Sequence, residues 1–556
     1  MVHARRAERK ILRGHTLEPR ENLFSSMKTE LERNRKKLHL EEEVKPYYLA
    51  VALTDTDSWH MTASLGTLMH RGDLRFRSIQ ANLRVGSYEL DNTGFHSIYP
   101  QSQSASVPFE YNDLAIRRGI FFAFDQAYKA AIQMYSQKNA YLRNHPRENM
   151  PPDWTRVTPL SVTQVGHSIE LSADEWLPVI KEASAVFRKY PAIQSSSVSI
   201  SASNRMEYLL TSEKQKSFTS DGLLSIIIAA SGQAEDGTAI YIDWRMNLTP
   251  DDEYPEREKI IKAAHETVSR LSALLDAPKI DENYSGPVIF EGKAAVDFVV
   301  ATLAPALASN PPPVTWSQKG VFENMIGRMI LPPWVDIVDD PGMKSHLGKT
   351  LAGNYEVDDE GVRAERLQLV KRGRLMGFLA SRRPSKDAMS SNGRGRGIFG
   401  SLNTVAAPSN FIVTSRKKLN RKAMKNELLK LVRKRGLKYG YIVRRSQSFG
   451  SFLNLFSDAR NLRLPNPIEM YRVDLKGRET LVRGAQLAPI PVSELERIVA
   501  MGGGPEVANI RMQPGFGVSI VTPDILVERI EISETPMQPQ RKPLLSSPLA
   551  GVDSKR

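Results

Sequence analysis

The sequence predicts an α+β protein, with an N-terminal sheet-plus-long-helix region followed by a mostly β C-terminal domain. Segments rich in β-branched and aromatic residues come in runs and do not alternate singly with helices. This order argues against a doubly wound parallel sheet. Most patterns with helical periodicity fall before residue 279, which places the long helices in the first half of the chain.

We expect the chain to divide into a short arm, two large parts and a tail. A length of 556 residues is enough for more than one domain, and 41% hydrophobic residues allow a sizeable core. The basic, polar start predicts a loose arm, and the Pro- and Ser-rich end predicts a disordered tail. The expected segments are 1–19 for the arm, 20–278 for the N-terminal α+β region, 279–531 for the β-rich domain and 532–556 for the tail.

The first half of the N-terminal region begins with a helical pattern over 22–38, where Leu23, Met27, Leu31 and Leu38 form a narrow apolar stripe. Strand patterns follow, and a cluster of Thr, Asp and Ser at 54–58 predicts a turn. A long helix is expected over 112–144. The expected strands are 48–53, 60–68, 74–83 and 88–90.

The second half repeats this arrangement of helix and strands. A helix is expected over 174–190, because Pro191 ends it, and another over 255–275, which Pro278 closes. Between them lie strand patterns at 198–200, 205–211, 223–230 and 239–247.

In the C-terminal domain, one helix is expected over 292–303, broken by Pro305, and another over 420–434, which Gly436 stops. The second helix should place Ala423, Leu428, Leu431 and Val432 on its core side. Turns are expected at 339–342 and 358–361, and a hairpin joins 366–370 to 375–379 through a Gly-containing loop.

Composition excludes several classes of site. The chain has no Cys, which excludes disulfides, thiol catalysis and thiolate zinc sites. It has no run of eighteen apolar residues, and its charged start lacks the apolar core of a secretory signal. We therefore expect a cytoplasmic protein with no membrane contact.

The net charge of +14 is concentrated over 416–445, where Glu427 is the one acidic residue among many Lys and Arg. The simpler interpretation is a solvated helix face. The alternative is a polyanion- or nucleic-acid-binding protein that uses this basic segment. No known DNA- or RNA-binding motif accompanies the segment, so nucleic acid is not the expected partner.

The order of the motifs in the second half resembles the C-terminal domain of the TldD/PmbA (TldE) family of metallopeptidase-related proteins. The likeness covers roughly 280–531 well and 20–278 loosely. Its motifs are Val338–Asp340, Asp358–Gly361, the hairpin, Ser391–Arg394, Ser409-Asn410, Gly286–Phe290, Asn466–Ile468, Leu481–Ala485 and Ser519–Val527.

The resemblance also implies what the chain lacks. TldD-type members carry an HExxxH zinc helix after the strand that matches 287–290. The corresponding positions here are Glu291 and Ala295 for the two ligands and Gly292 for the general base. The family's third ligand, a Cys, cannot occur in this chain. The chain therefore resembles the non-zinc TldE/PmbA type, with no catalytic residue, metal or cofactor of its own.

The resemblance implies a function as well. We expect a peptide-binding chamber for processing unfolded peptides, with zinc only on a partner subunit. The expected assembly is with a TldD-type subunit or as a homo-oligomer. An extended peptide can add to a sheet edge. In the family, the loop after the hairpin borders the cavity, so Asn392, Arg394 and Arg396 are candidate peptide-binding residues, the arginines for a carboxylate.

Other motifs fit their context poorly. His265-Glu266 begins a zincin pattern, but Ser269 occupies the second ligand position. His346 between Asp339, Asp340, Asp358 and Asp359 could contribute to a cation site, although turns explain each Asp without a metal. Gly395, Gly397 and Gly400 match a dinucleotide motif that neither follows a strand nor precedes a helix. An independently active peptidase with relocated ligands is the remaining alternative.

Overall fold

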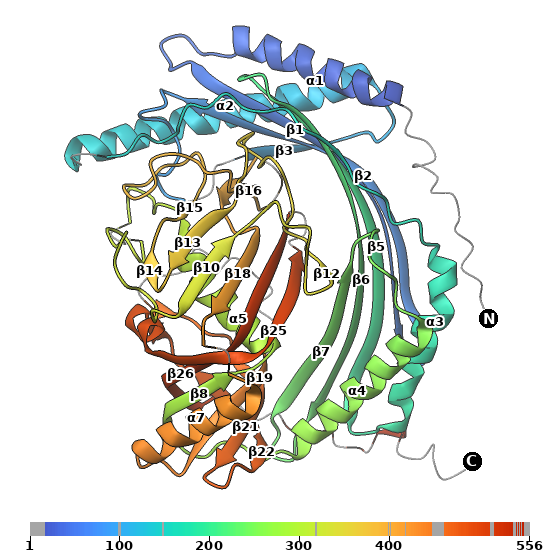
Figure 1. Cartoon of the computed structure of the whole chain (residues 1–556). Helices are drawn as coiled ribbons and strands as arrows, with labels where there is room; N and C mark the ends of the chain where they lie inside the picture. Colours follow the sequence, from blue (N-terminus) through green and yellow to red (C-terminus); the bar gives the residue numbers. More distant parts are fainter. Residues whose placement is uncertain are drawn as a thin grey trace.

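A long, curved N-terminal sheet arches around the C-terminal domain (Figure 1). The computed structural model describes residues 17–536, except 98–101, 147–149, 317–319, 399, 401, 418, 448–460 and 512–515, together with a few separate residues after 540. Residues 1–16 of the expected arm lie outside the described residues, as does most of the expected tail. The α+β prediction is confirmed: helices and a large sheet come first, and a strand-rich part follows.

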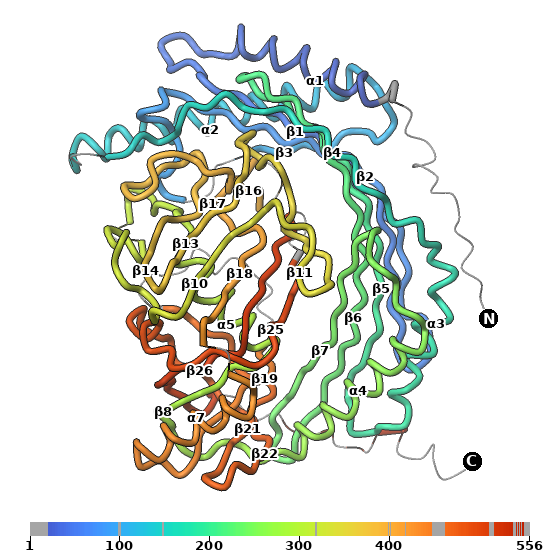
Figure 2. The backbone as a smooth tube through the Cα atoms, in the orientation of Figure 1, coloured from blue at the N-terminus to red at the C-terminus, as the bar shows by residue number. Residues whose placement is uncertain are grey.

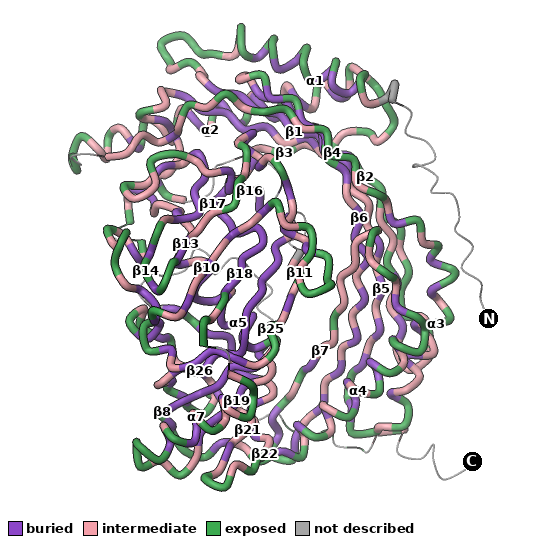
Figure 3. The backbone as a smooth tube through the Cα atoms, viewed as in Figure 1, coloured by how far each residue is buried: buried purple, intermediate pink, exposed green. Residues whose placement is uncertain are grey.

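The N-terminal sheet is built from long antiparallel hairpins. Its order is β3-β2-β1-β5-β6-β4, with β7 also pairing with β6. Buried and less buried residues alternate along much of β5 and β6 (Figure 3), as expected of strands whose successive side chains point to opposite faces of the sheet. The strands are β1 (Pro46–Ser64), β2 (Thr67–Val85), β3 (Ser102–Val107), β4 (Thr163–Val165), β5 (Ile193–Thr211), β6 (Lys216–Gln233) and β7 (Ala239–Leu248).

The predicted turn at 54–58 is wrong. These residues continue β1, where Asp55 pairs across the sheet with Arg77 on β2 and with Met206 on β5. The Asp55 carboxylate forms a buried ion pair with the Arg77 guanidinium at 2.6 Å. A partnered Asp is tolerated within a central strand, and the reversal occurs instead at Leu65 and Gly66, both with positive φ.

Helices cover the outer side of this sheet in two groups (Figure 1). One group packs Leu23, Met27, Ile120 and Phe124 against the strands near one end, and the other packs Ile180, Val268 and Leu271 near the opposite end. Asn112 caps the long helix through its side-chain oxygen, which accepts from Ala115 N at 2.9 Å. The helices are α1 (Leu17–Lys37), α2 (Asp113–Asn144), α3 (Ala173–Ala185), the 3-10 turn Val186–Lys189 and α4 (Arg257–Asp276).

The C-terminal domain is organised around one mixed sheet of order β14-β13-β10-β18-β26-β8-β19-β21-β22, to which β23 and β25 add at β26. Its strands are β8 (Tyr284–Phe290), β10 (Val335–Asp339), β13 (Leu367–Lys371), β14 (Arg374–Leu375), β18 (Asn410–Ser415), β19 (Tyr439–Ser446), β21 (Pro467–Asp474), β22 (Glu479–Val482), β23 (Ala485–Leu487), β25 (Ile498–Arg511) and β26 (Gly517–Glu534). The last strand thus continues beyond residue 531.

The loops of this domain contain short paired strands, and several of these loops face the curved sheet (Figure 2). The predicted hairpin is present, although its second strand, β14, ends at Leu375. The remaining strands are β9 (Ala308–Ser309), β11 (Ser345–His346), β12 (Lys349–Thr350), β15 (Leu379–Ala380), β16 (Gly395–Gly397), β17 (Thr404–Ala406), β20 (Asn461–Leu462) and β24 (Ile490–Pro491), and a 3-10 turn covers Val492–Arg497.

Two helices pack on the C-terminal sheet, with a short helical turn between them in sequence. They are α5 (Lys293–Ala301) and α7 (Arg421–Lys434), with α6 (Leu303–Ala306) after α5. On α7, Leu428 and Val432 are buried as predicted, Leu431 is partly buried against the same cluster, and Met424 and Leu429 are buried as well. This cluster includes Ile289 of β8 and Leu526 of β26, so α7 packs on the centre of the sheet. Among the described residues, no helix is both long and apolar enough to cross a membrane.

Candidate functional site

A polar cavity of about 170 Å³ lies between the curved sheet and the loops of the C-terminal domain. Both halves of the chain contribute to its wall. The N-terminal side supplies Arg205, Glu207 and Leu209 from β5 and Ser217, Thr219 and Asp221 from β6. The C-terminal side supplies Asn354, Tyr355, Asp358, Asp359, Arg396 and Phe516. The cavity is therefore an interdomain site, as ligand sites often are.

The N-terminal wall is a row of cross-strand pairs. Arg205 lies opposite Asp221, and Glu207 lies opposite Thr219, so the charged side chains share one face of the sheet. Arg205 donates to the Glu207 carboxylate through Nη2. Burial alone would lower the pKa of Arg205, but the charges of Glu207, Asp221 and Asp359 raise it. Its buried Nε has no hydrogen-bond partner.

The opposite wall is built on the acidic turn that the sequence singled out. Asp358 Oδ1 accepts from the backbone of Glu360 at 3.0 Å and Val362 at 2.8 Å, and its Oδ2 accepts from Gly395 N at 2.8 Å. Burial, reinforced by the neighbouring Glu360 carboxylate, raises the pKa of Asp358 well above its ordinary value. The turn thus holds β16 in place and presents carboxylates to the cavity.

Of the three predicted peptide-binding residues, only Arg396 lines the cavity. Its guanidinium lies 3.4 Å from Asp359 Oδ2 and 4.0 Å from the centre of the Tyr355 ring. Burial alone would lower the pKa of Arg396, but the Asp359 charge and Tyr355 raise it. Asp359 also accepts from Gly397 N at 2.6 Å, so Arg396 is held at the wall by both charge and ring contacts.

Arg394 and Asn392 do not line this cavity. Arg394 is fully buried and pairs with Asp339 at 2.6 Å, in the interior of the domain. Asn392 accepts from Ala380 N at 2.9 Å and donates to the Phe378 carbonyl at 2.8 Å. Arg394 precedes β16 and pairs in the interior of the domain, whereas Arg396 is the central residue of the strand and reaches the cavity wall. The hydrogen bonds of both residues hold the loop in place.

In the segment that corresponds to the family's zinc helix, Glu291 occupies the first ligand position, and its carboxylate forms an ion pair. Its carboxylate accepts from Arg444 Nε at 2.9 Å, and Arg444 also donates to Glu479 at 2.8 Å. Glu479 in turn accepts from Lys425 at 2.7 Å. A carboxylate that is nearly buried and already engaged by a guanidinium is stabilised without a metal.

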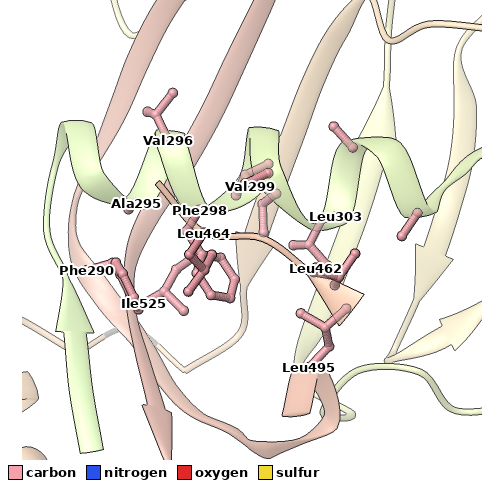
Figure 4. Packing of buried hydrophobic residues seen from close by; sticks show 14 of the residues in the cluster. Phe290, Ala295, Val296, Phe298, Val299, Leu303, Leu462, Leu464, Leu495 and Ile525 are labelled. Atoms are coloured by element: carbon pink, nitrogen blue, oxygen red, sulfur yellow. The ribbon is translucent and has the colours of Figure 1, made fainter. Parts of the chain in front are cut away.

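The other two positions of the window offer no ligand atom. Gly292 is the N-cap of α5 with φ of +54°, and its N–H donates to Asp524 Oδ1 at 2.7 Å. Ala295 is buried on α5 in the cluster that contains Phe290, Phe298 and Ile525 (Figure 4). A side chain at position 295 would therefore point into packed apolar surface.

The remaining sequence candidates are dispersed. Across the described parts of the chain, no three His, Asp or Glu side chains come together as metal ligands. His346 lies on the β11–β12 hairpin, whereas Asp339 is engaged by Arg394 and Ser409. His265 is exposed on α4. Gly395–Gly397 form β16, which pairs with β17 and is not followed by a helix.

Much of the basic segment is paired with carboxylates. Lys418 lies outside the described residues, but ion pairs are formed by Arg416 with Asp336, Arg421 with Asp524, Lys425 with Glu479, Lys430 with Glu427, Arg435 with Glu528, Arg444 with Glu291 and Glu479, and Arg445 with Glu469. These pairs reduce the local field that favoured a polyanion. No observation favours the nucleic-acid alternative.

Sequence reasoning missed the N-terminal wall of the cavity. Arg205, Glu207 and Asp221 all lie in or near segments predicted as strands, and their two-residue spacing places Arg205 and Glu207 on one face. That spacing was the available signal. It could not indicate which face meets the C-terminal domain.

The comparisons with known proteins agree with this architecture. Residues 283–534 match the sequence profile of the PmbA/TldA metallopeptidase C-terminal domain. No curated protein sequence matches the chain. Three solved structures share its fold over nearly the whole chain, at identities too low to show more than the fold.

The first structure is a candidate modulator of a DNA gyrase from Thermotoga maritima, with 14% identity and a TM-score of 0.56 over 92% of this chain and 100% of that one. The second is TldE from Thermococcus kodakarensis, with 15% identity and a TM-score of 0.57 over 91% and 100%. The third is a candidate modulator of DNA gyrase from Bacteroides thetaiotaomicron, with 13% identity and a TM-score of 0.58 over 93% and 99%. Residues 283–534 therefore form a C-terminal domain of the PmbA/TldA metallopeptidase family, and the chain as a whole shares the fold of these three structures.

Proposed function

We propose that this chain is a zinc-free, TldE-like member of its family that forms a peptide-binding chamber and acts with a zinc-bearing, TldD-type partner. The observation that carries the proposal is the ion pair of Glu291 with Arg444 at the first ligand position. A zinc ion there would compete with a guanidinium already in contact with the carboxylate, and Ala295 adds no second ligand.

The composition of the C-terminal domain supports the same conclusion. Within residues 283–534 the only His is His346, and there is no Cys. Catalytic zinc sites use three protein ligands, most often His with Cys or a carboxylate. The domain would have to rely on carboxylates alone for most of its ligands, which suits calcium or magnesium better than zinc.

The cavity and one sheet edge support peptide binding. Pairing of β4 with β6 covers the sheet edge beside the cavity, so an added strand has no access there. By contrast, β7 pairs only with β6 among the strands that the structure describes, which leaves its other edge for an extended peptide. Main-chain hydrogen bonds at that edge would bind peptides with little sequence preference, and the cavity would receive one side chain.

Metal analysis tests the zinc-free part of the proposal. The purified chain, incubated with excess zinc and then dialysed, is expected to retain no stoichiometric zinc and to cleave no unfolded peptide by itself. A zinc-bearing TldD-type homolog treated in parallel is the positive control. One zinc per chain, together with peptide cleavage that a chelator abolishes, would overturn the proposal.

Reconstitution tests the partner. Co-expression of the chain with a TldD-type homolog from the same source is expected to give a complex that copurifies and cleaves unfolded peptides faster than the homolog alone. Neither copurification nor any change in cleavage would contradict a role as its partner subunit.

A further inference from the structure

Two histidines lie side by side on the inner face of the curved sheet. His60 on β1 and His70 on β2 are both exposed, and their ring centres are 4.7 Å apart. Met61 is buried in the core beneath α3 and α4, so His60 points to the opposite face, which these helices leave uncovered (Figure 1). His70 pairs with Thr62, two residues after His60, and therefore shares that face.

Both imidazoles are available to a ligand from solution. Neither forms a hydrogen bond or an ion pair with another residue that the structure describes, and the ring contact of each is with the other. The backbone beneath them is fixed, because β1 pairs with β2 on one side and with β5 on the other. Side chains carried by paired strands are held in more constant positions than those on loops.

Gly72 leaves the space between the two rings open. It pairs with His60 across the strands and follows His70 by two residues, so it lies on the same face of the sheet. A Cβ at this position would lie 2.7 Å from His60 Cε1 and 3.3 Å from the Nε2 atoms of both His60 and His70. The two Nε2 atoms therefore border one small space, and they lie no further apart than twice 3.3 Å.

This arrangement fits a metal ion held between two imidazoles. A histidine nitrogen binds a first-row divalent metal at about 2.0–2.1 Å, so two such nitrogens on one ion are roughly 3–4 Å apart. Exposed side chains change their rotamers freely, and a rotation of either ring covers the remaining distance. The open space over Gly72 is where the ion would lie.

The ligand set favours Cu²⁺ among the common divalent ions. Two imidazoles leave the other coordination positions to water or to groups of a small molecule, which fits the tetragonal N/O geometry of Cu²⁺. Mg²⁺ and Ca²⁺ prefer oxygen ligands. Across the described residues no third His, Asp or Glu joins the pair. Zn²⁺ usually has three or more protein ligands, so it should bind here weakly and be lost on dialysis.

We propose that His60 and His70 form a binding site for Cu²⁺ on the inner face of the curved sheet, with Gly72 providing the room for the ion. The site lies in the N-terminal region, apart from the segment around Glu291 that corresponds to the family's zinc helix. It is independent of the proposed peptide-binding function.

Copper titration of the full chain, followed by electron paramagnetic resonance, tests the site. All proteins carry H3A, because His3 beside a free amino terminus is itself a copper ligand. One Cu²⁺ per chain is expected to bind with a spectrum that shows nitrogen coordination, and an equal concentration of Mg²⁺ should not displace it. A copper spectrum without nitrogen coordination would overturn the proposal.

Substitutions locate the ion. H60A and H70A should each weaken copper binding by roughly tenfold or more, since the second of two linked ligands acts at a high effective concentration. G72A should also weaken it, because the new Cβ occupies the space beside His60 Cε1 and leaves both imidazoles present. H265A is the matched control and should bind copper as the parent protein does, because His265 is exposed on α4.

Thermal unfolding midpoints show whether each variant is folded, and they should stay close to that of the parent protein because both histidines are exposed. Copper affinity that is the same in H60A, H70A and the parent protein would overturn the site. An equal loss in H265A would mean adventitious binding to surface histidines only, and would overturn it as well.

Discussion

Asp297 on α5 is a residue whose surroundings disfavour its charge. One carboxylate oxygen is buried without a hydrogen-bond partner, although Ser446 N donates to the group. Burial raises the pKa of Asp297 to about 7, against the opposing charges of Lys293 and Arg445. Asp243, on the N-terminal sheet, adds to the rise.

This pKa predicts how stability depends on pH. A carboxyl whose folded pKa is raised stabilises the fold below its unfolded pKa, and this contribution is lost as the pH rises through about 7. D297N should therefore be more stable than the natural chain at pH 8, by up to about 4 kcal/mol since each pKa unit is about 1.4 kcal/mol, and by only about 1 kcal/mol at pH 4.5. Thermal unfolding midpoints of both proteins at the two pH values measure this. A difference that does not grow with pH would contradict the prediction.

At the scale of a single helix, the residue that caps its N-terminus contributes to stability. Asn112 accepts from Ala115 N at the start of the 32-residue helix α2, which packs Ile116, Ile120 and Phe124 on the sheet. N112A should lower the free energy of unfolding by about 1 kcal/mol, because one orphan backbone N–H loses its partner.

The free energy of unfolding of the full chain, measured by chemical denaturation, tests this effect. Q137A is the control, since Gln137 is exposed on the same helix and its substitution should change stability by less than about 0.5 kcal/mol. Equal effects of the two substitutions would show that the cap contributes nothing.

At the scale of the whole molecule, Arg382 joins the two halves of the chain. Its guanidinium donates to the Glu213 carboxylate at 2.6 and 2.8 Å and to the Thr155 carbonyl at 2.8 Å, and it lies 4.6 Å from the Trp154 ring centre. The Arg382 side chain is 1% exposed. The C-terminal domain is therefore bound to the curved sheet through a buried, fully engaged arginine.

R382A should destabilise the protein by roughly 3–5 kcal/mol, because it leaves a mostly buried carboxylate without its partner. The double variant R382A/E213Q should recover part of that loss, since the unpaired charge is gone. Differential scanning calorimetry measures both changes. R478A, which breaks the exposed pair with Asp474, should cost less than about 1 kcal/mol, and a comparable loss there would contradict the argument.

Local patterns predicted more of the helices than of the strands. The helices expected over 112–144 and 420–434 are confirmed to within one residue, because apolar periodicity is a local signal. The strand expected to end before residues 54–58 continues through them, because Asp55 forms an ion pair with Arg77 on the neighbouring strand β2. A pattern along one segment carries no information about such a partner.

The residues of the candidate site were likewise only partly predictable from the sequence. Residues 358–361 and Arg396 could be selected from the sequence, since turn chemistry and a loop that follows a hairpin are visible in it. Arg394, two residues earlier, could not be distinguished from Arg396 until its buried pairing with Asp339 was seen. Arg205 and Asp221 form the opposite wall only because the sheet curves around the other domain.

The sequence by itself determined the α+β class, the long helices, the motif order that identifies the family and the absence of Cys, because each depends on local spacing or residue type. Only the tertiary structure decided which side chains meet. It brought Arg444 to Glu291 from β19 and set the carboxylates of β5 and β6 opposite those of the 358–361 turn. The physical reason is that burial and charge pairing depend on segments far apart in the chain, whose relative placement follows from packing the whole fold.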